Sequence, residues 1–359
     1  MSILADFWTG IQGLLFTAET LWQCSLTETQ KQLVSTLEVV RIEEHLCLCD
    51  QRLGRRPHDR RRMARALVAK AVYNFATTKQ LREALMEQEG LRQICGWSCP
   101  GQIPSESTFS RAFATFADRD LGSLVHEHLV RQWVGDQLVM HQSRDSTELP
   151  AREKTVRKRA KKRISTFEAT LSDGRVVKGT RLEIQKEQTI EEILRDLPQG
   201  CDAVTKRDSN GNLHTLIGYK VHVDWADGMI PLTVILTSAS VHDSQAAIPL
   251  ARMSAKRVTA CYELMDQAYD AASIRQVCGD LNHILLIDPV KNRKKYCPFD
   301  PAQKMRYRHR SNAERGNSRL KDEFGFQHLR VRGHKKVLLH AMMGILALFA
   351  DQIVKPLIG

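Results

Sequence analysis

The chain has 359 residues, a hydrophobic fraction of 42% and a formal net charge of +12. This length suits one large or two ordinary domains, and the apolar content excludes wholesale disorder. The positive charge favours a polyanionic partner, with an anionic membrane surface as the competing class. The apolar run 341–350 is too short to span a bilayer and is expected to be a buried helix.

The first residues lack a basic segment followed by a long apolar run, so no secretory signal is expected. The nine cysteines are odd in number and irregularly spaced, which does not indicate a disulfide framework. Two groups have zinc-like spacing, Cys47 and Cys49 near His45, and Cys95 with Cys99. Neither has a matching second pair, so we expect reduced thiols in a cytoplasmic protein.

Residues 1–131 have a helical pattern and are assigned to an N-terminal domain. Apolar spacing predicts a helix over 27–44, and Asp59 is expected to cap the next helix after the basic segment 54–62. Residues 103–109 open a further helix. Short helices with Arg or Ser/Thr at their starts suit a helix-turn-helix that contacts DNA phosphates; the alternative is an all-α packing module with solvated arginines.

A second domain is expected over 132–359, where strand and helix signals alternate. Residues 137–141 predict a short strand that runs into Asp145. An aspartate just past the end of a strand lies where α/β sheets place their chemistry. The alternative is a turn aspartate that bonds its own backbone.

A basic segment follows at 151–164, where one acid, Glu153, stands against a row of cations. Such a segment repels itself and is rarely core, so it is either a solvated stretch or an arm that follows DNA phosphates. The cations assigned to DNA binding are Arg157, Lys158, Arg159, Lys161, Lys162 and Arg163. With a helix near 189–197 and several turn residues, this stretch predicts an insertion at about 150–213.

Residues 216–225 and 230–238, joined by Ala-Asp-Gly, predict a β-hairpin. After a helix, the strand 261–265 is followed directly by Asp266. Asp270 is the alternative acid at this place and is expected to be a helix N-cap. Further strand and helix signals lead to a last helix over about 337–353.

The stretch 307–321 reads YRHRSNAERGNSRLK. On an α-helix, one face within an arc of about 60° would hold Tyr307, Arg310, Glu314 and Lys321. A second stripe, expected to be buried, would hold Ala313, Leu320 and Phe324. One interpretation is a solvated helix with i,i+4 ion pairing. The two aspartates at strand ends favour the other, a carboxylate beside cations that contact phosphate.

The whole order predicts a mixed α/β sheet flanked by helices, which resembles the ribonuclease H-like fold. The residues of 307–321 match the YREK signature of one group of bacterial insertion-sequence DDE transposases. Asp145-Ser146-Thr147 resembles that group's first acidic motif. Asp266-x-Ala268-Tyr269-Asp270 is similar to its second, with Ala268 where glycine is frequent. Segments 218–222 and 240–244 are similar to its hairpin region, and the resemblance covers about residues 100–355.

This resemblance implies a nucleoid-associated enzyme that binds the terminal inverted repeats of its element, cleaves DNA there and joins the 3′ ends to target DNA. It implies two Mg2+ or Mn2+ ions per active site, with Asp145 shared and Asp266 and Glu314 each completing one ion's ligands. Tyr307, Arg310 and Lys321 would contact phosphates. A homodimer on paired ends is implied and no membrane partner is expected. Asp243, a fourth acid near the hairpin, is expected to be structural or to lie next to the metal-binding acids without binding metal itself.

Three other functions compete with this one. A transposase-derived regulator would bind DNA without catalysis, although the presence of all three acids opposes it. A nuclease of the same fold would cut without joining. A membrane-surface protein would use the basic segment on anionic lipid.

Overall fold

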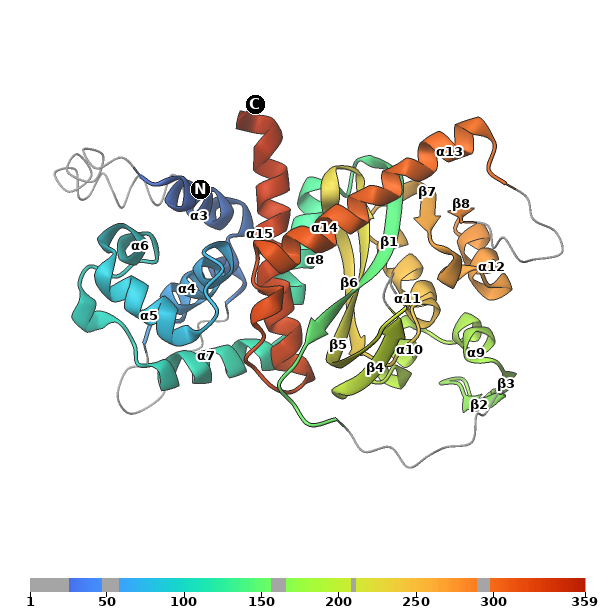
Figure 1. The fold of residues 1–359 in the computed structure, drawn as a ribbon, viewed down its shortest axis with the longest axis horizontal. Coiled ribbons are helices and arrows are strands. Elements are labelled where there is room, and N and C mark those ends of the chain that lie inside the picture. Colours follow the sequence, from blue (N-terminus) through green and yellow to red (C-terminus); the bar gives the residue numbers. More distant parts are fainter. Residues whose placement is uncertain (1–25, 47–57, 156–165, 208–210, 289–297, 359) are drawn as a thin grey trace. The chain divides into compact units, whose positions relative to one another are not determined.

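The computed structural model describes residues 26–46, 58–155, 166–207, 211–288 and 298–358. The chain divides into two compact units, the first made of 1–129, 319–331 and 335–359, and the second of 130–318 and 332–334 (Figure 1). The C-terminal segments thus group with the N-terminal helices, and the functional domains 1–131 and 132–359 remain a prediction. The cations at 157–163 and the cysteines at 47 and 49 lie outside the described residues.

The N-terminal part of the first unit is helical, as predicted. Its elements are α3 (Glu28–Val40), η1 (Ile42–His45), α4 (Arg60–Val72), α5 (Thr78–Glu87), α6 (Glu89–Ile94), η2 (Pro100–Gln102), α7 (Glu106–Asp118) and α8 (Leu121–Trp133), which continues into the second unit. Asp59 caps α4 as expected, because its Oδ1 accepts from the Arg61 N–H at 2.9 Å. Thr27 caps α3 through a capping box with Gln30.

The last helix, α15 (His334–Ile358), is longer than predicted. Over His334–Lys355 it is the one helix in the described residues that is long and apolar enough to cross a membrane, and 72% of its most apolar window is buried. Phe349 meets His126 edge-on at 6.1 Å between ring centroids, and Asp351 pairs with Arg319 at 2.9 Å. These contacts make α15 a core helix of the first unit, as expected for residues 341–350.

A six-stranded mixed sheet forms the second unit, as predicted. Its strands are β1 (Leu138–Pro150), β4 (Asp202–Arg207), β5 (Leu213–Ala226), β6 (Ile230–Ser238), β7 (Thr259–Met265) and β8 (Ile284–Ile287). β5 pairs antiparallel with β1, β4 and β6, whereas β7 pairs parallel with β1 and β8. The predicted hairpin is β5–β6, joined by η3 (Asp227–Met229).

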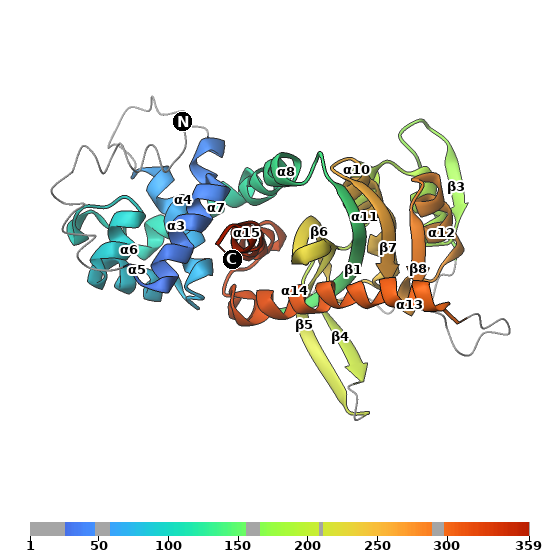
Figure 2. The ribbon, with the colours of Figure 1, turned by 90° about the horizontal axis from the view of Figure 1, so that it is seen from above.

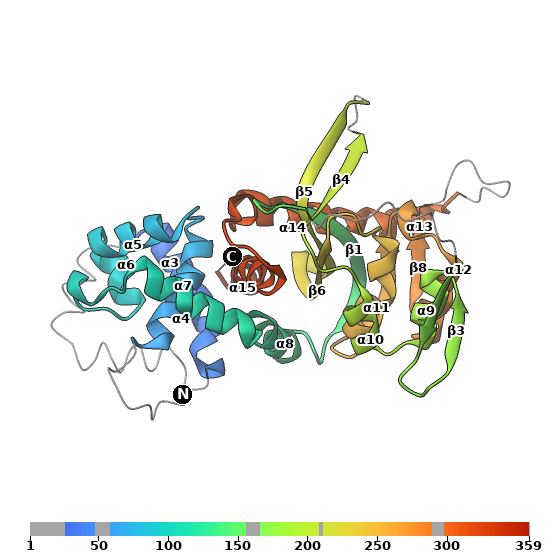
Figure 3. The same cartoon turned by 90° about the horizontal axis from the view of Figure 1, so that it is seen from below.

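The strand β5 changes partners along its length. Its first half pairs with β4, and the resulting ribbon extends away from the rest of the sheet (Figures 2 and 3). At the change, a Cβ on Gly218 would lie 2.2 Å from the Leu149 carbonyl oxygen, so only glycine fits there. Between β1 and β5 the chain also forms β2 (Phe167–Thr170), β3 (Val176–Gly179), α9 (Arg181–Glu187) and α10 (Ile190–Asp196). That this stretch is an insertion into the fold remains a prediction.

Helices cover both faces of the sheet (Figure 2). On one face, α11 (Ser244–Ala255) and α12 (Ala272–Asp280) bury apolar side chains with β6, β7 and β8, among them Ile235, Leu250, Met265, Ile274 and Ile287. Along the other run α13 (Pro301–Tyr307), η5 (Arg308–Arg310) and α14 (Ser311–Asp322). A Cβ on Gly316 would lie 2.6 Å from the Trp225 ring, so this glycine lets α14 approach the sheet closely.

Three local predictions were wrong in detail. β1 extends through Asp145, which therefore lies inside a strand, because pairing with β5 continues to Pro150 and overrides the local turn signal. The stretch from Tyr307 is not one uninterrupted α-helix, since η5 separates α13 from α14. Asp270 is not an N-cap: Ala271 caps α12, and Asp270 instead pairs with Arg275 at 2.9 Å.

Candidate active site

Asp145 and Asp266 come from adjacent parallel strands. Ser143 on β1 pairs with Leu264 on β7, and the same register continued by two residues sets Asp145 beside Asp266. Burial raises the pKa of both carboxyls, and the charge of Asp266 raises that of Asp145 further. The strand register therefore brings together two acids that lie far apart in the sequence.

Each aspartate is held in place by its own hydrogen bonds. Asp145 accepts from Asn317 Nδ2 at 3.0 Å and from the backbone N–H of Ser146. Asp266 accepts from the Ala268 N–H at 2.9 Å and so caps η4 (Gln267–Tyr269). Asn317 was missed in the sequence because it is uncharged, yet it lies one turn after Glu314 on α14.

Arg310 connects Glu314 to the two aspartates. It forms the predicted i,i+4 ion pair with Glu314. Burial alone would lower the pKa of Arg310, but the acidic groups around it, Tyr307, Glu314, Asp145 and Asp266, together raise it. The three predicted acids thus all interact electrostatically with the guanidinium of Arg310.

The other predicted DNA contacts are placed differently. Tyr307 donates its hydroxyl to the Met265 carbonyl oxygen at 3.1 Å, which ties the end of α13 to the end of β7. Burial raises the Tyr307 pKa to about 12, so the phenol is neutral at physiological pH. Lys321 lies on α14 beyond Glu314, in the part of that helix that belongs to the first unit.

The remaining acids near this site already have basic partners. Lys220 Nζ contacts Asp243 Oδ1 at 2.8 Å and the Val241 carbonyl oxygen at 2.7 Å. The burial cost of Asp243 is outweighed chiefly by Lys220, which lowers the pKa of that carboxyl. Asp243 is thus the ion-pair partner of Lys220, and its charge also acts on Asp266, whose pKa it raises.

Two families of known proteins match the chain. The family described as Transposase DDE domain matches residues 145–350, a span that begins at Asp145 and includes Asp266 and Glu314. The chain belongs to the DDE transposase family. The family described as Transposase domain (DUF772) matches residues 28–115, the helices α3 to α7 of the first unit. A comparison with curated proteins gave no match.

The protein is therefore a transposase, in a family of metal-dependent DNA-cleaving enzymes. Its mixed sheet flanked by helices, with helices preceding it in the chain, fits the ribonuclease H-like fold of such enzymes. The match supports the predicted resemblance at the level of the family. The YREK group, and the role of each acid, are taken up below as proposals.

On the opposite face of the transposase sheet lies a closed charge network that the sequence did not reveal. Arg144 contacts Asp224 through two bonds of 2.7 and 2.9 Å and Glu263 at 3.2 Å, and all three side chains are at most 1% exposed. His283 Nδ1 lies 2.6 Å from Glu263, and Ser254 on α11 donates to Asp224 at 2.8 Å. The residues of this network come from different strands and helices, so no local sequence motif predicts it.

A second group of polar side chains lies on the same face as Asp145. Among the described residues of the transposase, the one trio of His, Cys, Asp or Glu whose ligand atoms all lie within 4.8 Å of one another is His141, Asp227 and His309. The three predicted acids are spaced more widely. Asp227 appeared in the sequence only as a hairpin residue, and the two histidines carried no motif.

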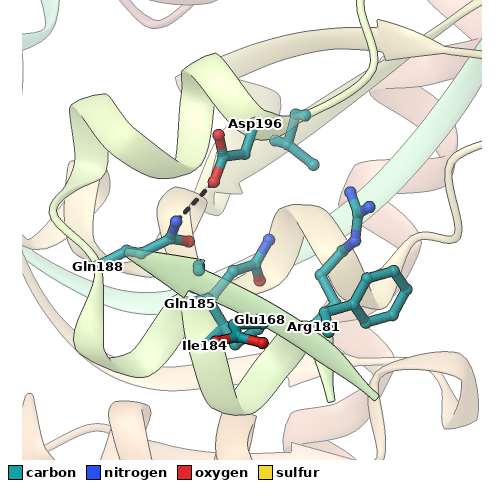
Figure 4. Close-up of a pocket in the computed structure, with 9 residues that line it drawn as sticks. Glu168, Arg181, Ile184, Gln185, Gln188 and Asp196 are labelled. Carbon is teal, nitrogen blue, oxygen red and sulfur yellow. Dashed lines mark hydrogen bonds between the residues drawn. The ribbon is translucent and has the colours of Figure 1, made fainter. Parts of the chain in front are cut away.

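A pocket in the transposase opens beside β2, α9 and α10 (Figure 4). Arg181 lies over the Phe167 ring at 5.2 Å, and Gln188 donates to Asp196 at 2.6 Å. None of the predicted site residues lines this pocket. This pocket is therefore not part of the candidate active site.

Proposed function

We propose that this transposase binds the terminal inverted repeats of an insertion sequence, cleaves the DNA at the element ends and joins the 3′ ends to target DNA. In this proposal it belongs to the YREK-signature group, and it acts as a homodimer on paired ends. Asp145, Asp266 and Glu314 are the catalytic carboxylates. The observation that carries the proposal is the parallel register of β1 and β7, which sets two acids side by side beneath the helix that bears the third.

The composition of this site suits divalent cations. Three carboxylates surround one guanidinium, so the group carries excess negative charge, and hard cations such as Mg2+ or Mn2+ take oxygen ligands of this kind. Asp145 would be shared between two ions, with Asp266 and Glu314 each completing one set of ligands. When bound, the ions would supply activation of the attacking oxygen and stabilisation of the leaving one.

The surrounding residues have roles in binding and orientation. Asn317 holds the Asp145 carboxylate through its amide at 3.0 Å. Tyr307 fixes the start of the helix against β7, and Arg310 is the cation that would exchange its carboxylate partners for a phosphate as metal enters. Lys321 would contact phosphate further along, and the cations at 157–163 would follow the backbone as part of an insertion.

The helical first unit would recognise the element end. The transposase-domain match over 28–115 supports this assignment. The net charge of +12 supports binding that weakens steeply as salt rises.

The proposal is tested with a duplex that carries the terminal inverted repeat found beside the gene, incubated with protein and Mg2+. We expect nicking at the repeat end and, with a target duplex present, a strand-transfer product. Both should be lost in Asp145→Asn, Asp266→Asn and Glu314→Gln. Cleavage that survives all three substitutions would refute the assigned roles.

Matched controls are available for two of these substitutions. Asp270→Asn removes the neighbouring acid that pairs with Arg275, and Glu323→Gln removes an equivalent i,i+4 partner of Arg319. Both should retain cleavage. Specific DNA binding without cleavage in the wild type would indicate a regulator, and cleavage without joining would indicate a nuclease.

A further inference from the structure

The trio His141, Asp227 and His309 joins three segments that lie far apart in the chain. His141 is on β1, Asp227 is on η3 between β5 and β6, and His309 is on η5 directly before α14. The backbone N–H of His141 donates to Asp227 Oδ2 at 2.9 Å, which fixes the carboxylate. Ser143 Oγ donates to the His309 carbonyl oxygen at 3.2 Å, which fixes η5 against β1.

Two of the distances within the trio are close to those between ligands of one small ion, and all three ligand atoms lie within 4.8 Å of one another. His141 Nδ1 lies 3.1 Å and His309 Nδ1 lies 3.5 Å from the same carboxylate oxygen, Asp227 Oδ1. Ligand atoms bound at 2.0–2.1 Å in a tetrahedral zinc site are about 3.3 Å apart. The two imidazole rings are stacked, parallel within 9° and with centroids 4.0 Å apart, so one ring must tilt before both nitrogens can point at the same ion.

The trio is also chemically suited to such an ion. The His141 side chain is only 9% exposed and is held beside Asp227 in the folded protein, and a neutral imidazole is the form that binds metal. His309 has 47% of its side chain exposed and can tilt to direct its lone pair at an ion. Two imidazoles and a carboxylate favour Zn2+ and its neighbours over Mg2+.

We propose that His141, Asp227 and His309 form a mononuclear site for a transition-metal ion of the Zn2+ class, separate from the carboxylate site of the transposase. With three protein ligands, it leaves a fourth position for water. The ion would fasten η5 to β1 and to the end of the β5–β6 hairpin. It would thereby hold Arg310 and Glu314, which follow His309 in the chain, over the sheet. The site does not depend on the proposed DNA chemistry.

The test uses the full-length protein carrying Asp145→Asn, Asp266→Asn and Glu314→Gln together, so that the carboxylate site cannot take the probe. After treatment with a chelator and dialysis, this triple variant is titrated with CoCl2. We expect one Co2+ per chain with the intense visible ligand-field absorption of a four-coordinate ion, and competition by ZnCl2. Adding His309→Ala should weaken the affinity at least about 100-fold.

Two further variants keep the result interpretable. His214→Ala removes an exposed histidine on β5 outside the trio and should leave Co2+ binding unchanged. Zn2+ should raise the Tm of the triple variant but not of the triple variant that also carries His309→Ala, whose side chain is 47% exposed. No Co2+ bound by the triple variant, or equal affinity after His309→Ala, would show that the trio is only hydrogen-bonded and would overturn the proposal.

Discussion

Two successive residues of β1, Arg144 and Asp145, serve opposite faces of the same sheet. On the Arg144 face, contacts of 2.7–3.2 Å join the buried Arg144 to Asp224 and Glu263, and His283 lies 2.6 Å from Glu263. On the Asp145 face, Arg310 is the arginine that interacts with all three of Asp145, Asp266 and Glu314. Both faces are rich in ionisable groups, so charge content does not distinguish structure from chemistry.

The difference lies in charge balance. A buried ion pair with satisfied hydrogen bonds is stable as a unit, and it fixes the strands that carry its members. A group of carboxylates with too few cations is costly to the folded state, which is the condition expected where a cation is to be bound.

Arg144→Met should have the largest effect on stability. The substitution keeps a long apolar side chain but leaves Asp224 and Glu263 buried without their cation, which costs about 3–5 kcal/mol. Urea unfolding followed by circular dichroism measures the loss. The control is Arg275→Met, whose arginine is 48% exposed and should contribute less than about 1 kcal/mol. Equal losses in the two variants would contradict the structural role of Arg144.

Gly316→Ala should disturb the Asp145 face of the sheet by displacing α14. The new Cβ would lie 2.6 Å from the buried Trp225 ring, so α14 must move outward, at about 1–3 kcal/mol. Because Glu314 is on the same helix, we also expect DNA cleavage to fall by up to about 100-fold.

The matched control is Gly279→Ala in α12, where an added Cβ meets nothing within 4 Å. It should be neutral or slightly stabilising. Cleavage by Gly316→Ala at the wild-type rate would show that the position of α14 does not matter for the chemistry.

The sequence predicts a contact between residues only when a local pattern points to each of them. Asp145, Asp266 and Glu314 could be singled out because short motifs and helix periodicity are local signals, although Asp145 lies inside β1 and not past its end. Their catalytic roles remain a prediction. The partners of Arg144 could not, because Asp224 and Glu263 come from strands that only the folded sheet places beside it. The length of β1 was underestimated for the same reason: its ladder with β5 is a tertiary effect. His141, Asp227 and His309 are likewise joined only by folding.

His222, which lies on the same face of the sheet as Arg144, should make the folded protein less stable in acid. This ring is fully buried against Thr237 at 2.9 Å, and burial lowers its pKa from 6.5 to about 3. The unfolded chain therefore binds the proton first, so stability is complete above pH 6.5 and falls as pH drops toward 3. One unit below 6.5, at about pH 5.5, the loss is about 1.4 kcal/mol.

Urea unfolding of wild type and His222→Gln at about pH 7.5 and 5.5 measures this contribution, because glutamine does not titrate there. The pH dependence should be smaller in the variant by about that amount. His214→Gln, on the exposed half of the same strand, should keep the wild-type dependence. An unchanged slope in His222→Gln would mean that the folded protein accepts the proton on this ring.

Asp145→Asn gives the smallest change in stability and the sharpest contrast with its neighbour. Burial raises the pKa of Asp145, so its ionised form is unfavourable in the folded state, and its contribution to stability falls as pH rises above the ordinary aspartate pKa. The asparagine oxygen can still accept from Asn317 and Ser146. At about pH 7.5 we expect the free energy of unfolding to rise by up to about 1 kcal/mol while cleavage is lost. Glu263→Gln on the Arg144 face should instead lower it by several kcal/mol, because Arg144 outweighs the cost of burial and holds the pKa of Glu263 below its usual range. If both substitutions destabilised the protein equally, Asp145 would be a structural acid, and the proposal that the Asp145 face of the sheet is catalytic would be wrong.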